Sequence, residues 1–195
     1  PFDELCENSN ASILSDCIDN LDPNLFYQWC REGKYNRVYL LCREPHRFDL
    51  NSGVEIALRH DQTDIATTLL DYGASNHNAV VKYAVIHKDS ELLVYMIYEW
   101  GNRCNWDLAL RMALAPRYLT VVYILIDCEV CSWDTVLVVA AKIGDIESID
   151  IAIKNGARIF GEAIAVAKKN NKNATATYIR ESTGIVLKKR NSPTF

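Results

Sequence analysis

The cysteines are the residues whose chemistry is easiest to examine in the sequence. Cys128 and Cys131 form a CxxC pair, and Cys104 lies 27 positions before Cys131. The sequence contains no second CxxC and no close pair of histidines to complete a zinc site. Packed helices lie about 8–10 Å apart, which is too far for equivalent sulfurs on two helices to share one zinc ion. We therefore expect neither a bound metal nor another cofactor.

No catalytic signature stands out among the remaining residues. The sequence lacks a glycine-rich phosphate loop, a nucleophile elbow and an HExxH zinc motif. The histidines are spread along the chain, at His46, His60, His77 and His87. The sequence therefore predicts a binding protein and not an enzyme.

Basic side chains recur on alternate predicted helices. Those helices carry Arg59, Lys82, Arg111 and Lys142, extended by Lys168 and Lys169, with Glu55 as their only acid. The helices between them are rich in Asp and Glu. Although the formal net charge is −4, such a basic row would attract an acidic segment of a partner. The alternative is that Lys and Arg serve there because their long stems cover apolar surface.

A second row is aromatic. Trp106, Trp133 and Phe160 occupy equivalent places in successive segments, and His77 occupies the same place one segment earlier. Tryptophan is enriched at binding hot spots, so this row is a candidate anchor for a partner. Alternatively, the rings pack at the beginnings of helices and replace contacts that a β-hairpin would otherwise make.

A sequence repeat positions both rows. Small residues recur mostly every 27 positions and define what we call the reference positions: Cys30, Ala57, Ala84, Ala113, Ala140 and Ala167. Each is followed by a polar break four or five places later and, in the first five repeats, by a mostly apolar pair at the eighth and ninth places. These pairs are Val38-Tyr39, Ile65-Ala66, Leu92-Leu93, Val121-Val122 and Ser148-Ile149, in which Ser148 departs from the pattern. Most repeats close on a glycine (Gly73, Gly101, Gly156 and Gly184), which Glu129 replaces in the fourth repeat.

A repeat of this length is typical of a solenoid, and solenoids mostly bind other molecules. We expect an all-α fold of about six helix-turn-helix repeats over residues 22–184, with a capping segment at 1–21 and a basic tail at 185–195. A polar residue six places before most reference positions can cap or begin the first helix of its repeat. These residues are Asn24, Asn51, Asn78, Asp107 and Asp134, with Gly161 in the last repeat.

Two repeats resemble the ankyrin motif. The resemblance rests on the run from Ala140 to Asp145 with Lys154 to Ala157, and on Ala57-Leu58 with Leu69 to Ala74. The Thr-Pro-Leu-His opening is absent and the period is shorter than the usual ankyrin length of about 33 residues. The resemblance implies ankyrin-like helix pairs whose β-hairpin fingers are short or absent.

Trimmed and degenerate repeats with phrases such as Tyr98-Glu99-Trp100-Gly101 are similar to the ankyrin-like multigene-family proteins of African swine fever virus and other large DNA viruses. The resemblance implies a host-range factor that antagonises interferon or inflammatory signalling by binding a host protein. It carries over no catalytic residue.

The seven cysteines are an odd number without framework spacing, which is typical of a reducing compartment. Residues 1–10 do not resemble a secretory signal, and the longest apolar stretch, 118–126, is too short to span a membrane. We expect a cytoplasmic or nuclear protein that binds a protein partner through Arg59, Lys82, Arg111, Lys142, Trp106, Trp133 and Phe160. The alternatives are a self-associating scaffold and, less favoured by the net charge, a nucleic-acid-binding protein.

Overall fold

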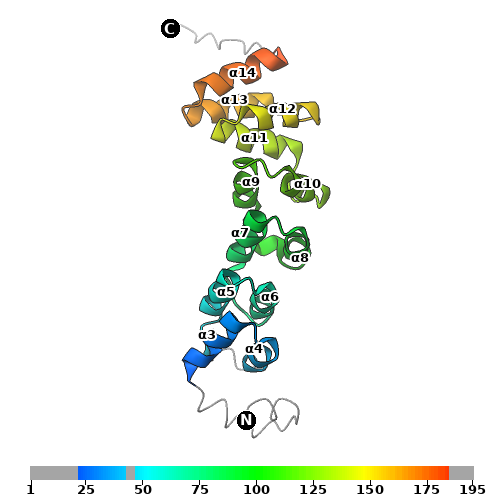
Figure 1. Cartoon of the computed structure of the whole chain (residues 1–195). Helices are drawn as coiled ribbons and strands as arrows, with labels where there is room; N and C mark the ends of the chain where they lie inside the picture. Colours follow the sequence, from blue (N-terminus) through cyan, green and yellow to red (C-terminus); the bar gives the residue numbers. More distant parts are fainter. Residues whose placement is uncertain (1–21, 43–46, 185–195) are drawn as a thin grey trace, which may run out of the picture. The chain divides into compact units, whose positions relative to one another are not determined.

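The computed structural model describes residues 22–42 and 47–184, and within them every regular element is helical (Figure 1). These residues form twelve α-helices and one short 3-10 helix, and they contain no strand. This confirms the prediction of an all-α fold. The expected capping segment, 1–21, and the expected basic tail, 185–195, lie outside the described residues.

The chain divides into two compact units, and unit 1 ends at Cys104. Its helices are α3 (Pro23–Glu32), α4 (Tyr35–Leu41), α5 (Leu50–Arg59), α6 (Thr63–Asp71), α7 (His77–His87), α8 (Ser90–Trp100) and the 3-10 helix η2 (Gly101–Arg103). Helices α3 and α4, α5 and α6, and α7 and α8 pack as pairs. We call α3, α5 and α7 the first helices and α4, α6 and α8 the second helices of their pairs. First helices pack on first helices and α4 packs on α6, which gives two layers within the unit (Figure 1).

Unit 2 begins at Asn105 and repeats this pairing. Its helices are α9 (Trp106–Leu114), α10 (Leu119–Asp127), α11 (Trp133–Ile143), α12 (Ile146–Lys154), α13 (Phe160–Lys169) and α14 (Asn173–Thr183). The pairs are α9 with α10, α11 with α12, and α13 with α14. The first helices α9, α11 and α13 pack in sequence, and the second helices α12 and α14 contact each other.

The residues at the reference positions are the buried centres of these pairs. All six side chains, Cys30, Ala57, Ala84, Ala113, Ala140 and Ala167, are 0% exposed. From Ala57 onward, the carbonyl of each accepts a hydrogen bond from the backbone N–H five residues later, at 2.7–3.0 Å. The residue just before that donor has a left-handed backbone, with φ between 56° and 93°: Asp61, Lys88, Arg117, Gly144 and Asn171. The predicted polar break is therefore the tight turn between the two helices of a pair.

The predicted closing residues are correct in four of five repeats. Gly73, Gly156 and Gly184 have left-handed backbones, and Glu129 adopts the same conformation at φ 58°. Gly101 is an exception, because its φ is −48° and it begins η2. The interval between Ala84 and Ala113 is two residues longer than the others, and this 3-10 turn occupies it. A 3-10 turn needs a right-handed backbone. The residue that closes this repeat therefore does not adopt the left-handed conformation.

The residues predicted to cap or begin the first helices lie in their first turns, and the caps stand two residues earlier. The first helices are capped by Asp22, Asp49, Asn105 and Ser132, whose side chains accept hydrogen bonds from N–H groups of the first turn. At Asp49, hydrogen bonds from the Ser52 hydroxyl and backbone lower the pKa of the carboxyl group. The residues six places before the reference positions occupy the second position inside each helix.

Two of these residues instead connect neighbouring helix pairs. The Asn51 Oδ1 atom accepts hydrogen bonds from the backbone N–H groups of Ser75, at 2.7 Å, and Asn76, at 3.3 Å. The Asp134 Oδ1 atom does the same with Arg158, at 2.6 Å, and Ile159, at 3.2 Å. In both cases the donors lie just before the next first helix. These side chains therefore hold the next helix pair in place and satisfy backbone groups that no helix bond can satisfy.

Two cysteines are buried, and their burial raises the pKa of their thiols. Cys30 and Cys42 are 0% exposed, and burial raises the pKa of each thiol to about 12. A thiol in such surroundings packs as a small hydrophobic side chain. Cys30, Cys42, Cys104, Cys128 and Cys131, which are the cysteines in the described residues, are all free thiols.

Replacing Asp134 with Ala should lower the free energy of unfolding by about 1–3 kcal/mol, because two backbone donors lose their acceptor. Asp134→Asn is the matched control, since it retains an Oδ1 acceptor and should lose clearly less. Urea denaturation followed by far-ultraviolet circular dichroism measures both changes. Equal losses in the two variants, or none in Asp134→Ala, would show that this connection does not stabilise unit 2.

Candidate functional site

The four predicted basic residues share one face of the first helices. Lys82 and Arg111 lie two places before their reference residues, and Arg59 and Lys142 lie two places after theirs. These two places are four residues apart, so their side chains are neighbours on one side of a helix. We call this side the first-helix face. The reference residue points into the core, so the residues two places before and two places after it lie on the opposite side of the helix.

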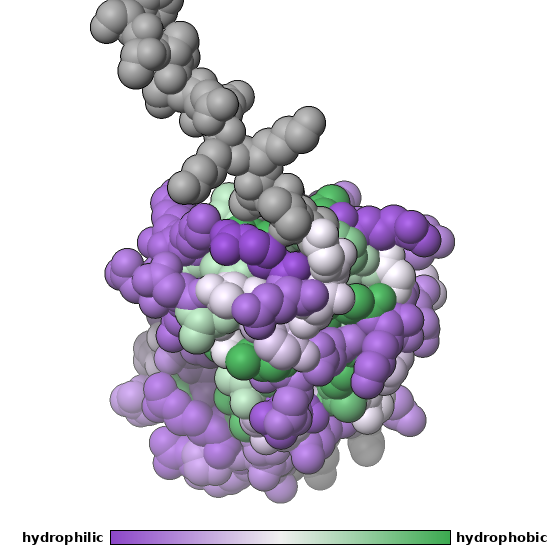
Figure 2. Space-filling view, turned by 90° about the horizontal axis from the view of Figure 1, so that it is seen from above, coloured by the Kyte–Doolittle hydropathy of each residue, from purple (hydrophilic) through white to green (hydrophobic). Residues whose placement is uncertain are grey.

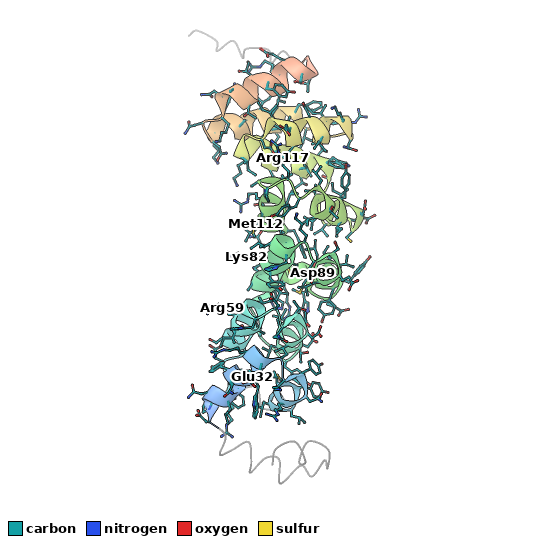
Figure 3. All side chains as sticks on the ribbon, in the orientation of Figure 1. Glu32, Arg59, Lys82, Asp89, Met112 and Arg117 are labelled. Carbon is teal, nitrogen blue, oxygen red and sulfur yellow. The ribbon has the colours of Figure 1, made fainter. Side chains whose placement is uncertain are left out.

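In unit 1 the first-helix face is hollowed into a groove between α5 and α7. The groove has a volume of about 430 Å³ and is lined by Glu55, Leu58, Arg59, Ala79, Lys82, Tyr83, Ile86 and His87. The structure therefore brings together Arg59 and Lys82, two of the residues predicted to bind a partner. Figure 3 shows these two side chains on the first-helix side of the unit, whereas Asp89 lies on the side of the second helices.

The tyrosine in this groove is fixed by the preceding helix pair. The Tyr83 hydroxyl donates a 2.7 Å hydrogen bond to Asp61 Oδ1, and Asp61 is the left-handed turn residue between α5 and α6. The Tyr83 ring stacks on His87, with 4.0 Å between centroids and 16° between planes. Burial, together with the carboxylate of Asp61, raises the pKa of Tyr83 to about 12. This part of the groove is thus held by contacts from both helix pairs.

An isoleucine in the groove was not predicted as a site residue. Ile86 is 53% exposed and lies two places after a reference residue, where the second and fifth repeats carry Arg59 and Lys142. Leu58 and Ala79 line the same groove. The signal in the sequence is an apolar residue at a position that is basic in the second, fifth and sixth repeats. The groove therefore combines positive charge with an exposed apolar contact.

Two of the basic residues pair with acidic residues of their own helices. Arg59 pairs with Glu55 at 3.3 Å, and Arg111 pairs with Asp107 at 3.2 Å. The expectation that Glu55 is the only acid of these helices is wrong, because Asp107 and Asp134 lie inside α9 and α11. The Arg59 side chain is still 72% exposed. Surface ion pairs of this kind contribute only about 0.2–1 kcal/mol, so a partner carboxylate can replace one easily.

The other predicted site residues belong to unit 2. Arg111 is half-buried on α9, and Lys142 is exposed in the last turn of α11. Trp106, Trp133 and Phe160 are the first residues of α9, α11 and α13, and each is half-buried. The Trp133 ring packs edge-on against Tyr123, with centroids 5.5 Å apart.

Two residues of the aromatic row, His77 and Trp133, pack against other aromatic rings. In unit 1 the equivalent residue, His77, is only 4% exposed and its ring lies 4.7 Å from that of Trp100. Trp133 has a similar ring neighbour in Tyr123. These contacts support the packing interpretation for His77 and Trp133, and the basic groove is the stronger site.

The described residues contain no group of three or more His, Cys, Asp or Glu side chains that could hold a metal ion. None of their helices is long and apolar enough to cross a membrane. Figure 2, which looks onto the molecule from above α14, shows hydrophilic side chains over most of that face with smaller apolar patches between them. No protein-family model matches the chain, and no curated protein matches it.

The bond between Tyr83 and Asp61 predicts a pH dependence. A raised pKa means that the folded protein favours the neutral phenol, so this stability is present below pH 10.0 and is lost as pH rises toward about 12. Tyr83→Phe should therefore remove one late-titrating group from the tyrosinate absorbance curve. Asp61→Asn, which tolerates the left-handed backbone, should lower the pKa of Tyr83 without abolishing its shift. If the wild-type and Tyr83→Phe curves differ by a group that titrates near 10, the groove does not hold this tyrosine as described.

Proposed function

We propose that this protein is a protein-interaction module whose groove between α5 and α7 binds an acidic segment of a partner protein. The observation that carries the proposal is that Arg59, Lys82, His87 and the exposed Ile86 line one groove. Carboxylates of the partner would face Arg59 and Lys82, and an apolar side chain would pack on Ile86. No catalytic group is needed for this role.

The same pattern continues on the first helices of unit 2. The two places of the first-helix face hold one basic residue and one small or apolar residue in each repeat: Arg111 and Ala115, Val138 and Lys142, Ala165 and Lys169. Of these, Lys142, Lys169, Ala115 and Ala165 are exposed. A partner segment that alternates acidic and apolar residues would complement this pattern in either unit. Trp106, Trp133 and Phe160 would then support the helices and would not be the main anchors.

We further propose that residues 22–184 are six repeats of an ankyrin-like solenoid that lacks β-hairpin fingers. The recurrent left-handed turn four places after the reference position supports this proposal, as does the packing of first helices on first helices within each unit. In such stacks the first helices provide the binding surface, which agrees with the position of the groove.

On the resemblance to the ankyrin-like proteins of large DNA viruses, we propose a host signalling or immune protein as the partner, bound in the host cytoplasm or nucleus. The contribution expected from charge is modest for each contact, because single exposed ion pairs are weak. Several pairs together with the apolar contact at Ile86 would give specificity and speed the encounter.

A peptide-display selection against the purified chain tests this function. The selected peptides should contain Asp or Glu beside an aliphatic or aromatic residue, and Arg59→Glu with Lys82→Glu should weaken their binding by about tenfold or more. Lys154→Glu with Arg158→Glu is the matched control, because it makes the same change in net charge at exposed positions of unit 2. Fluorescence anisotropy of a labelled selected peptide measures all three affinities.

Equal binding by the wild type and the groove variant would reject the groove as the site. Loss of binding in both charge variants would indicate attraction by net charge alone and would also reject it. Strong retention of the wild type on a polyanion column, with a steep dependence on salt, would favour the nucleic-acid alternative instead.

A further inference from the structure

Two of the second helices of unit 1, α6 and α8, carry the opposite charge to the groove on the first helices. Helices α6 and α8 contain Asp64, Asp71, Glu91 and Glu99, and neither contains Lys or Arg. A hollow of about 320 Å³ lies between them, lined by Thr63, Asp64, Thr67, Asp89, Glu91, Leu92 and Tyr95. Three of these seven residues are acidic and none is basic, so this hollow is suited to a cation.

Helix electrostatics does not account for all of these acids. Acidic residues in the first turn of a helix, such as Asp64 and Glu91, are favoured by the helix dipole. Asp71 is the last residue of α6, and Glu99 is the last but one of α8, where the dipole disfavours negative charge. Both are exposed. Their presence therefore needs another explanation than the stability of their own helices.

Exposed tyrosine rings accompany the acids. Tyr35 and Tyr39 on α4 stack with centroids 6.1 Å apart, and Tyr39 meets Tyr72 edge-on at 5.8 Å. Tyr35 is 44% exposed, Tyr39 36%, and Tyr98 on α8 75%. Thr68 Oγ1 lies 3.3 Å from the Tyr35 hydroxyl, which links the rings on α4 to α6. The Tyr95 hydroxyl donates to Asp71 Oδ1 at 3.3 Å, which links α8 to α6. We call these rings and acids on α4, α6 and α8 the acidic tyrosine face.

Carboxylates beside exposed aromatic rings are suited to a guanidinium group. A carboxylate can accept two parallel hydrogen bonds from arginine, and the face of a tyrosine ring attracts the same planar cation. Two acids on the second helices of unit 2 have partners within that unit. Glu147 pairs with Arg117 at 2.6 Å, and Asp150 accepts a 2.6 Å hydrogen bond from Tyr178.

We propose that the acidic tyrosine face binds an arginine-rich segment of a partner protein. The acids favour a basic segment by charge complementarity. The tyrosine rings favour arginine over lysine, because the planar guanidinium group stacks on a ring better than an ammonium group does. This surface is separate from the groove of the proposed function and takes a partner of opposite charge. A chain with both surfaces can hold an acidic segment on its first helices and an arginine-rich segment on its second helices.

Fluorescence anisotropy with labelled nona-arginine and nona-lysine peptides tests this inference on the full chain. The wild type should bind the arginine peptide several-fold more tightly than the lysine peptide at physiological salt. Asp64→Lys with Glu91→Lys should weaken arginine binding by about tenfold or more. Tyr35→Leu with Tyr98→Leu should reduce the preference for arginine over lysine, because it removes ring faces without changing charge.

The matched control is Glu162→Lys with Glu181→Lys, which makes the same change in net charge at exposed positions of unit 2. An equal loss of affinity in the control and in the Asp64 and Glu91 variant would overturn the proposal, as would the absence of any preference for arginine. The Lys82→Glu variant must retain arginine binding, so failure of the first-helix groove and failure of this face are distinguishable. If light scattering shows a wild-type dimer that both Asp64→Lys and Lys82→Glu dissociate, the occupant is a second copy and the proposal is wrong.

Discussion

The interaction on which the structure depends is the packing of a small side chain at each reference position. The six residues there are 0% exposed, although they are separated along the chain by 27 or 29 positions. A larger side chain at such a site would separate the packed helices, and overpacking of a well-filled core costs about 1–3 kcal/mol. From Ala57 onward the carbonyl of the same residue also closes the turn to the second helix. One residue therefore sets both the distance between helices and the start of the next helix.

Surface positions follow from this constraint. Once the reference residue points into the core, the residues two places before and two places after it lie on the first-helix face. The residue six places before it lies in the first turn, where Asn51 and Asp134 reach the backbone of the next helix pair. The residue four places after it forms the turn, and there Asp61 accepts the hydrogen bond of Tyr83. Binding residues and stabilising residues thus occupy different places of the same repeat.

This separation explains how much the sequence could predict. The reference positions, the turns and the role of Glu129 depend on local backbone conformation and on burial, and both leave periodic signals in the sequence. The sequence does not locate the caps, because short polar residues occur both six and eight places before most reference positions, and only the three-dimensional structure shows which side chain meets the first turn. The conformation of Gly101 depends on how two extra residues are accommodated, and the spacing alone does not determine that. The groove between α5 and α7 required the side-chain positions of Tyr83, Ile86 and His87, which lie outside the predicted basic row.

The distribution of charge can be separated into a part that stabilises helices and a part that does not. Arg59, Arg111 and Lys142 lie in the last turns of first helices, where positive charge interacts favourably with the helix dipole. Their presence alone is therefore weak support for a binding site. Lys82 lies in the middle of α7, and Ile86 is exposed near its end, so neither residue gains from the dipole. Because these two residues share the groove with Arg59, the argument for a partner on the first helices rests more on Lys82 and Ile86 than on the basic row as a whole.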